Sequence, residues 1–213
     1  NDFDSERLPD LSYAQRDATL FVDTIKATAP AAFASVDPTS FDATNATRDA
    51  ILAELDRVVA GAGEGTDIAI FYAGHGLQDA DGSYYLAMPA TDPDRLADTA
   101  LPWAEVSQRL DAAKGRVTVF LDSCHSGNAG RDLFSTNDGA VASILERTRS
   151  GVVVLAASKG REQAIERADM GGGLFTTAVA AVIGTERQRY DVNGNGAIEA
   201  SELYRGVKAR VSE

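Results

Sequence analysis

Two apolar runs dominate the chain, and each ends abruptly beside a reactive side chain. Residues 67–74 read Asp-Ile-Ala-Ile-Phe-Tyr-Ala-Gly, and residues 117–121 read Val-Thr-Val-Phe-Leu. Short apolar runs rich in β-branched residues are typical of strands buried on both faces, and parallel sheets are built from such strands. His75 follows the first run and Cys124 follows the second. Because ligands bind at the carboxyl ends of the strands in open parallel sheets, the pattern predicts a functional site at this edge.

The remaining hydrophobic patterns predict helices that alternate with strands. Apolar residues recur at helical spacing over residues 12–28, 47–59, 102–110 and 174–183. Shorter apolar runs predict strands over residues 32–36, 82–89 and 151–157, of which 82–89 reads as part of a hairpin. This alternation predicts one domain over residues 1–213, an α/β sandwich around a mainly parallel sheet. Residues 128–150 show no strand pattern, and a connection of that length is expected to be functional or mobile.

Composition narrows the class of protein without naming a function. The chain has 213 residues, of which 44% are apolar and 24% charged, values typical of a globular protein with a sizeable core. Its net charge of −12 argues against a nucleic-acid partner and would attract cationic substrates. A single cysteine excludes an internal disulfide and slightly favours a reducing, cytoplasmic location. We find no apolar run of the ~20 residues that a membrane-spanning helix needs.

The cysteine and the first histidine suggest nucleophilic catalysis. His75 precedes Cys124 by 124 − 75 = 49 residues, the order and spacing expected of caspase-type cysteine peptidases. A lone cysteine is more often a buried hydrophobic residue, but Cys124 lies in a polar turn rather than inside the apolar run. Gly74 and Gly76 are expected to give the backbone freedom beside His75 and to leave room for a substrate. His125 should project away from its neighbour Cys124, so we expect it to be structural.

An α/β-hydrolase is the obvious alternative, and the sequence excludes it. That fold requires glycine two residues before and after its nucleophile and a histidine late in the chain. Those two places hold Asp122 and Ser126 here, and the second and last histidine is His125.

The two motifs carry a family resemblance. Residues 72–76, Tyr-Ala-Gly-His-Gly, and residues 122–127, Asp-Ser-Cys-His-Ser-Gly, resemble the histidine and cysteine motifs of caspase-like peptidases of the metacaspase and orthocaspase branch. Residues 11–18, 154–158 and 173–176 are similar to flanking motifs of the same group. The resemblance implies a caspase-like α/β/α sandwich and proteolysis by a His75–Cys124 dyad. It also implies that the first core strand of the family is missing before Asn1.

The resemblance and the residues together assign a substrate class. The backbone N–H groups of Gly76 and Cys124 would stabilise the oxyanion. Asp122 should share a strand face with Cys124, and Asp17 matches the first-helix aspartate that metacaspases use with it. Two carboxylates suit an Arg or Lys side chain before the scissile bond. The alternative is that Asp17 is a solvated helix residue.

The family's inter-subunit linker falls at residues 128–150, which implies possible self-cleavage. Such cleavage would use the enzyme's own basic residues in this segment as substrate. The candidate positions are Arg131, Arg147 and Arg149.

A calcium loop is the other candidate site. Residues 191–202 match the EF-hand pattern, with Gly196 at its sixth place and a helix expected after it. The expected ligands are Asp191, Asn193, Asn195, Ala197 and Glu202. Only one such loop is present, and a turn with Asx bonds that starts a helix is the alternative.

Two other functions remain open from the sequence. One is a catalytically silent caspase-like scaffold that serves as a calcium-binding interaction module. The other is a caspase that cuts after Asp, which Asp17 and Asp122 disfavour. A cysteine dyad needs no cofactor for its chemistry, and calcium is a possible ligand of the protein.

Overall fold

The structure is a computed structural model, and it describes residues 3–123, 152–157, 166–167 and 172–211. The chain divides into two compact units. The first unit comprises Asn1–Ser12 and Phe41–Ala164, and the second comprises Tyr13–Ser40 and Ile165–Glu213. The prediction of one domain over 1–213 stays a prediction.

A parallel sheet forms the centre of the first unit. Its strands are β1 (Asp67–Gly74), β5 (Arg116–Ser123) and β6 (Val152–Ala156), in the order β1-β5-β6. The strands predicted over residues 67–74, 117–121 and 151–157 are therefore confirmed, and their pairing is parallel as expected. β5 runs two residues further than its apolar pattern, so that Asp122 and Ser123 belong to the strand.

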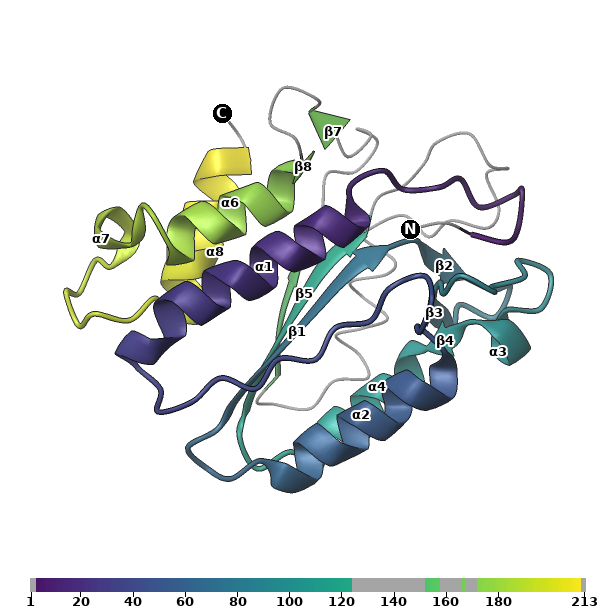
Figure 1. The fold of residues 1–213 in the computed structure, drawn as a ribbon, viewed down its shortest axis with the longest axis horizontal. Coiled ribbons are helices and arrows are strands. Elements are labelled where there is room, and N and C mark those ends of the chain that lie inside the picture. Colours follow the sequence, from purple (N-terminus) through teal and green to yellow (C-terminus); the bar gives the residue numbers. More distant parts are fainter. Residues whose placement is uncertain (1–2, 124–151, 158–165, 168–171, 212–213) are drawn as a thin grey trace. The chain divides into compact units, whose positions relative to one another are not determined.

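One face of this sheet is covered by α2 (Arg48–Gly61) and α4 (Trp103–Leu110), which lie side by side (Figure 1). Side chains with even numbers in β1 and odd numbers in β5 face these helices, as strand alternation requires. Trp103, 1% exposed, lies in this core. The other core members from these elements are Leu52, Leu55, Ile68, Val106, Leu110, Val117, Val119 and Leu121.

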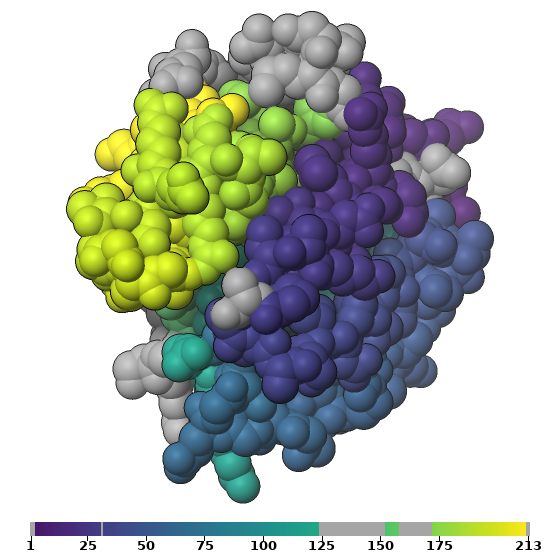
Figure 2. Space-filling model, turned by 60° about the vertical axis from the view of Figure 1, so that its left-hand side comes forward, coloured from purple at the N-terminus to yellow at the C-terminus, as the bar shows by residue number. Residues whose placement is uncertain are grey.

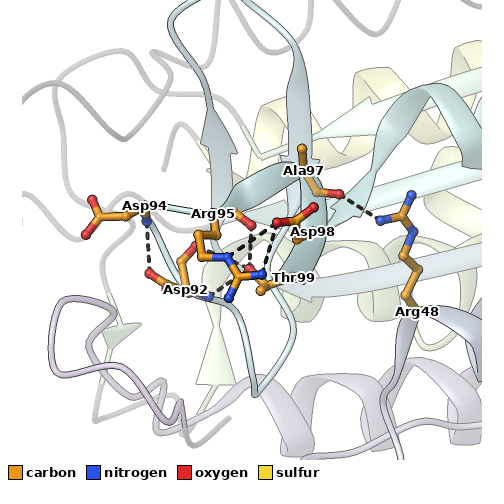
Figure 3. A network of polar contacts seen from close by, with 7 residues as sticks. All are labelled: Arg48, Asp92, Asp94, Arg95, Ala97, Asp98 and Thr99. Carbon is orange, nitrogen blue, oxygen red and sulfur yellow. Dashed lines mark hydrogen bonds and ion pairs between the residues drawn. The ribbon is translucent and has the colours of Figure 1, made fainter.

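Polar contacts fix where α2 begins. The Thr47 side chain accepts a hydrogen bond from the Ala50 N–H at 3.3 Å, which caps the helix. Arg48 then forms an ion pair with Glu105 of α4 and donates to the Ala97 carbonyl at 2.8 Å. Figure 3 shows this last contact beside a local network around α3 (Leu96–Thr99). In that network Arg95, Asp92 and their neighbours close the turn before α3.

A small antiparallel sheet follows His75. It contains β2 (Gly76–Gln78), β3 (Tyr84–Leu86) and β4 (Leu101–Pro102), in that order. β2 and β3 form the predicted hairpin, whose turn includes Gly82 with a left-handed φ of 87°. A second apolar cluster lies against this sheet and contains Leu8, Leu77, Tyr85, Ala87, Leu96 and Ala100.

Helices dominate the second unit. α6 (Leu174–Ile183) packs against α1 (Ala14–Thr28) on one side and α8 (Ala200–Val211) on the other (Figure 1). A Cβ atom at Gly206 would lie 2.9 Å from Val182 Cγ2 and 3.0 Å from Tyr190 Cδ1, so α8 approaches closely there. The described remainder of this unit comprises η1 (Ala29–Ala31), β7 (Glu166–Arg167), β8 (Gly172–Gly173) and α7 (Arg187–Tyr190). Figure 2 shows the green-to-yellow α6–α8 region as a continuous packed surface.

The strand expected over residues 32–36 is wrong. Pro30 stands in the first turn of the 3₁₀ helix η1, and the N–H groups of Ala32 and Phe33 donate back to the Ala29 carbonyl at 2.8 Å. The chain therefore keeps turning where the apolar pattern suggested extension. Pro38 lacks the N–H that a ladder would need shortly afterwards.

Among the helices of the described ranges, none is both long enough and apolar enough to cross a membrane.

Candidate functional site

The register between β1 and β5 aligns the two sequence motifs. Asp67 pairs with Arg116 and Gly74 pairs with Ser123, so the offset is 49 residues along the whole ladder. The same offset separates His75 from Cys124 in the sequence. His75 therefore directly follows the last paired residue of β1, and Cys124 directly follows the last paired residue of β5.

His75 is completely buried, and its ring is oriented by a backbone carbonyl. Its Nε2 atom lies 2.7 Å from the Pro9 carbonyl oxygen. A carbonyl only accepts hydrogen bonds, so Nε2 carries a proton and donates. In the neutral ring the other nitrogen, Nδ1, is then the acceptor, which is the state required of a general base. The Phe3 ring lies against the imidazole with 5.0 Å between ring centroids.

The segment that supplies Pro9 and Phe3 is held in place by its own contacts. The Phe3 N–H donates to Asp10 Oδ1 at 2.9 Å, and the Asp4 N–H donates to the Pro89 carbonyl at 2.9 Å. Leu8 is 2% exposed within the second apolar cluster. Sequence reasoning missed Pro9 because it acts through a carbonyl that every residue possesses, and no side-chain pattern marks such a group.

The backbone around His75 is braced by Tyr72. Its hydroxyl lies 2.8 Å from the His75 carbonyl oxygen and 3.0 Å from that of Ala87, and its single proton serves one of them at a time. A Cβ atom at Gly74 would lie 2.5 Å from Tyr72 Cζ and closer still to the hydroxyl. Gly74 is thus needed to admit a tyrosine hydroxyl. The expectation that it supplies backbone freedom is corrected, because the described glycines with left-handed φ are Gly82, Gly194 and Gly196.

Position 76 also requires glycine to admit a tyrosine side chain, and the Gly76 N–H points in a direction that the strand pairing determines. A Cβ atom there would lie 2.8 Å from Tyr84 Cζ. The Ala87 N–H donates to the His75 carbonyl at 2.9 Å, and the Asp79 N–H donates to the Ser83 carbonyl at 3.1 Å. Hydrogen-bonded pairs alternate with non-bonded pairs in an antiparallel ladder, so Gly76 occupies a non-bonded position opposite Leu86. Its N–H is consequently directed away from β3.

Asp122 and Ser123 occupy opposite faces at the end of β5. Ser123 shares the face of Val119 and Leu121, towards α2 and α4, whereas Asp122 lies on the other face, opposite Ala73 of β1. Asp122 is 5% exposed and Ser123 is 6% exposed. Aspartate is rarely this deeply buried. A buried carboxylate needs an opposite charge or hydrogen-bond donors to compensate for the loss of water.

Asp17 is also buried, at 4% exposure, in the first turn of α1. The alternative that it is a solvated helix residue is therefore excluded. Its two carboxylate oxygens lie 3.0 and 3.1 Å from the Gly173 nitrogen, whose N–H donates to them at the start of α6. A Cβ atom at Gly172 would lie 2.8 Å from Asp17 Oδ1, so this carboxylate is tightly enclosed. Asp17 and Asp122 belong to different units, and their sharing of one pocket stays a prediction.

The loop of residues 191–202 satisfies its side-chain oxygens internally. Asp191 accepts the N–H groups of Asn195 and Gly196 at 3.1 and 2.8 Å. Glu202 accepts the N–H groups of Glu199 and Val192 at 3.1 and 2.8 Å, and thus closes the start of α8. These hydrogen bonds, with the one from Glu199 largest, hold the pKa of Glu202 below its ordinary value.

The oxygens in this loop are nevertheless of the kind that calcium prefers. They come from carboxylates, side-chain amides and the Ala197 carbonyl, and Gly196 has the left-handed φ of 79° that the sharp turn of an EF-hand loop needs. Within the described ranges, no group of three or more His, Cys, Asp or Glu side chains is arranged to hold a metal ion. The turn with Asx bonds is thus observed, and calcium binding stays a prediction.

Several predicted site residues lie outside the described residues. They are the nucleophile Cys124, its neighbour His125, the linker of residues 128–150, and the cleavage candidates Arg131, Arg147 and Arg149.

Comparison with known proteins establishes the family. The caspase domain, a peptidase family, matches residues 1–213, the whole chain. Among solved structures, the fold is similar to the crystal structure of protein GSU0716 from Geobacter sulfurreducens, with a TM-score of 0.61 and 18% identity. That match covers 94% of this chain and 80% of the other, and at such identity it shows the fold alone. No curated protein matches the sequence. The chain therefore belongs to the caspase domain family of cysteine peptidases, whose α/β fold has a mainly parallel sheet flanked by helices.

Proposed function

We propose that this protein is a cysteine endopeptidase that cleaves after Arg or Lys through a His75–Cys124 dyad. The observation that carries the proposal is the constant 49-residue offset between β1 and β5, which ends at the Gly74–Ser123 pair. Adjacent strands lie about 4.8 Å apart, and a residue's Cα is about 3.8 Å from that of its chain neighbour. His75 and Cys124 each follow one member of this pair in the sequence, so we expect their side chains to come within hydrogen-bonding reach of each other.

The chemistry would proceed in two stages. His75 Nδ1 takes the proton of the Cys124 thiol, and the thiolate attacks the scissile carbonyl carbon. The resulting oxyanion accepts hydrogen bonds from the backbone N–H groups of Gly76 and Cys124. His75 gives a proton to the leaving amine, which departs and leaves a thioester on Cys124. His75 then takes a proton from water, whose oxygen attacks the thioester and releases the carboxylic acid and the thiol.

Three features of the first unit support these roles. The hydrogen bond from His75 Nε2 to the Pro9 carbonyl leaves Nδ1 as the basic nitrogen of the neutral ring. Because the whole ring is buried, it keeps one orientation from substrate to substrate. The Gly76 N–H is directed away from β3, as an oxyanion donor requires.

The preference for Arg or Lys rests on buried carboxylates. Asp17 and Asp122 are 4% and 5% exposed, and a desolvated carboxylate binds a guanidinium or ammonium more strongly than a solvated one does. Two carboxylates would also repel the Asp side chain that Asp-directed caspases accept. They would thus contribute to substrate specificity as well as to substrate binding. The net charge of −12 favours the approach of cationic peptides.

Replacing either member of the dyad is expected to abolish peptide hydrolysis. Cys124→Ala removes the nucleophile, and His75→Ala removes the proton carrier, which contributes about 10²–10⁴-fold to such reactions. Turnover of a fluorogenic Arg peptide by each purified variant measures the loss. His125→Ala is the matched control and should stay much closer to wild type. Appreciable turnover in Cys124→Ala or His75→Ala would refute the dyad, provided that circular dichroism shows both to be folded.

Removing one pocket carboxylate is expected to weaken cleavage after Arg and Lys selectively. Asp17→Asn or Asp122→Asn removes one of the two carboxylates proposed to face the substrate cation, which costs about 2–5 kcal/mol of transition-state stabilisation. The measurement is kcat/KM over a peptide panel that varies only the residue before the scissile bond, with Asp and Ala peptides included. Asp23→Asn, at an exposed position of α1, is the control. Wild-type kcat/KM for Arg peptides in either variant would remove that residue from the pocket.

Self-cleavage is expected within residues 128–150, most readily after Arg147 or Arg149. A peptidase draws its substrate into an extended strand, so a basic site in a long connection is the natural internal target. Mass spectrometry of the new termini, after incubation with and without calcium, identifies the cuts. Cys124→Ala must stay intact under the same conditions. A wild-type chain that remains uncut while it hydrolyses Arg peptides contradicts this prediction.

Calcium is expected to bind once, at the loop of residues 191–202. Isothermal titration of the metal-free protein should give one site, and Asp191→Asn should weaken it by about tenfold or more because it removes one ligand charge. Asp23→Asn again serves as the control for a lost surface charge. Absence of binding up to millimolar calcium would show that the loop is only a helix-starting turn.

A further inference from the structure

Tyr84 is a buried tyrosine whose hydroxyl lies deep inside the first unit. It stands in β3, is 4% exposed, and belongs to the same apolar core as Val119 and Leu121 of β5. A buried hydroxyl needs a hydrogen-bond partner, and this one shares a hydrogen bond with the side chain of Ser123. Burial raises the pKa of Tyr84 to about 12, so the side chain is an uncharged phenol at neutral pH.

The same hydroxyl presses against the backbone of Gly76. A Cβ atom at Gly76 would lie 2.8 Å from Tyr84 Cζ and 2.9 Å from Cε2, and closer still to the hydroxyl oxygen. Any larger residue at position 76 would displace the ring. The Tyr84 side chain therefore contacts both Gly76, which follows His75 in the sequence, and Ser123, which precedes Cys124.

We propose that Tyr84 is a positioning residue for the peptidase reaction, which sets the spacing between Gly76 and the end of β5 through its hydroxyl. The inference rests on the proposed function, in which Gly76 supplies an oxyanion N–H and Cys124 follows Ser123. Oxyanion donors act only within a few tenths of an ångström of their productive place, and a misplacement of 1 Å can cost about 10²-fold in rate. The apolar packing that holds β3 against β5 lacks this precision, because dispersion contacts have no preferred direction. A hydrogen bond between two hydroxyl groups has a preferred distance and direction, so it can set this spacing.

The next residue of the same strand provides a matched control. Tyr85 is 6% exposed, and its hydroxyl donates to Asp79 Oδ2 at 2.9 Å. Side chains alternate across β3, so Tyr85 lies in the second apolar cluster with Leu77 and Leu96. Tyr85→Phe and Tyr84→Phe thus remove the same group from neighbouring residues of one strand, but the hydroxyl that reaches Gly76 and Ser123 is that of Tyr84.

The test is a comparison of steady-state kinetics on a fluorogenic Arg peptide. Tyr84→Phe should lower kcat by about 10- to 100-fold and leave KM within about twofold, because it disturbs an interaction made in the transition state. Tyr85→Phe should keep both constants within about twofold of wild type. Thermal unfolding of both variants, and assays well below their midpoints, exclude loss of folded protein as the cause.

Ser123→Ala gives an independent second variant. It removes the other hydroxyl and should reproduce the kcat loss of Tyr84→Phe. The double variant should lose no more than either single variant, since both remove one shared hydrogen bond. Losses that multiply in the double variant, or a Tyr84→Phe variant with the turnover of Tyr85→Phe, overturn the role of Tyr84 while leaving the dyad intact. A wild-type protein without Cys124-dependent turnover overturns the dyad and the role of Tyr84 together.

Discussion

The parallel pairing of β1 with β5 is the constraint on which the rest of the candidate site depends. Each strand packs the side chains of one face against α2 and α4, so a slip of one residue would turn those side chains to the other face of the sheet. The core therefore fixes the register, and the register fixes which residues leave the sheet side by side. His75 owes its place to the packing of Ile68, Val117 and their neighbours, which take no part in chemistry.

Glycine and tyrosine act as pairs around His75. Gly74 admits the hydroxyl of Tyr72, and Gly76 admits that of Tyr84. The Tyr72 hydroxyl lies within hydrogen-bonding distance of the His75 carbonyl, the Tyr84 hydroxyl lies between Gly76 and Ser123, and the Pro9 carbonyl holds the His75 ring. A histidine held at its ring and at its own carbonyl group loses little further freedom when a substrate binds, which is the advantage of preorganisation.

Two buried carboxylates of this acidic chain, those of Asp17 and Glu202, are compensated by backbone N–H groups. Asp17 accepts from Gly173 at the start of α6, and Glu202 accepts from three N–H groups before and at the start of α8. The positive ends of helix dipoles lie at such places, which further favours the charged form. Because the pKa of Glu202 is lowered in the folded state, its contribution to stability is present above its ordinary pKa. That contribution is lost as the pH falls through the lowered value.

The sequence by itself determined the strands of the parallel sheet, the longer helices and the family, because apolar periodicity and the histidine and cysteine motifs are local signals. It failed at residues 32–36, where hydrogen bonds back to Ala29 overrode an apolar run. Only the tertiary structure decided that Pro9 orients His75, that Asp17 is buried, and that Tyr84 reaches both Gly76 and Ser123. These contacts join residues far apart in the chain, or use backbone atoms common to all residues. A sequence pattern carries no information about either kind of contact, because the partners meet only when the chain has folded.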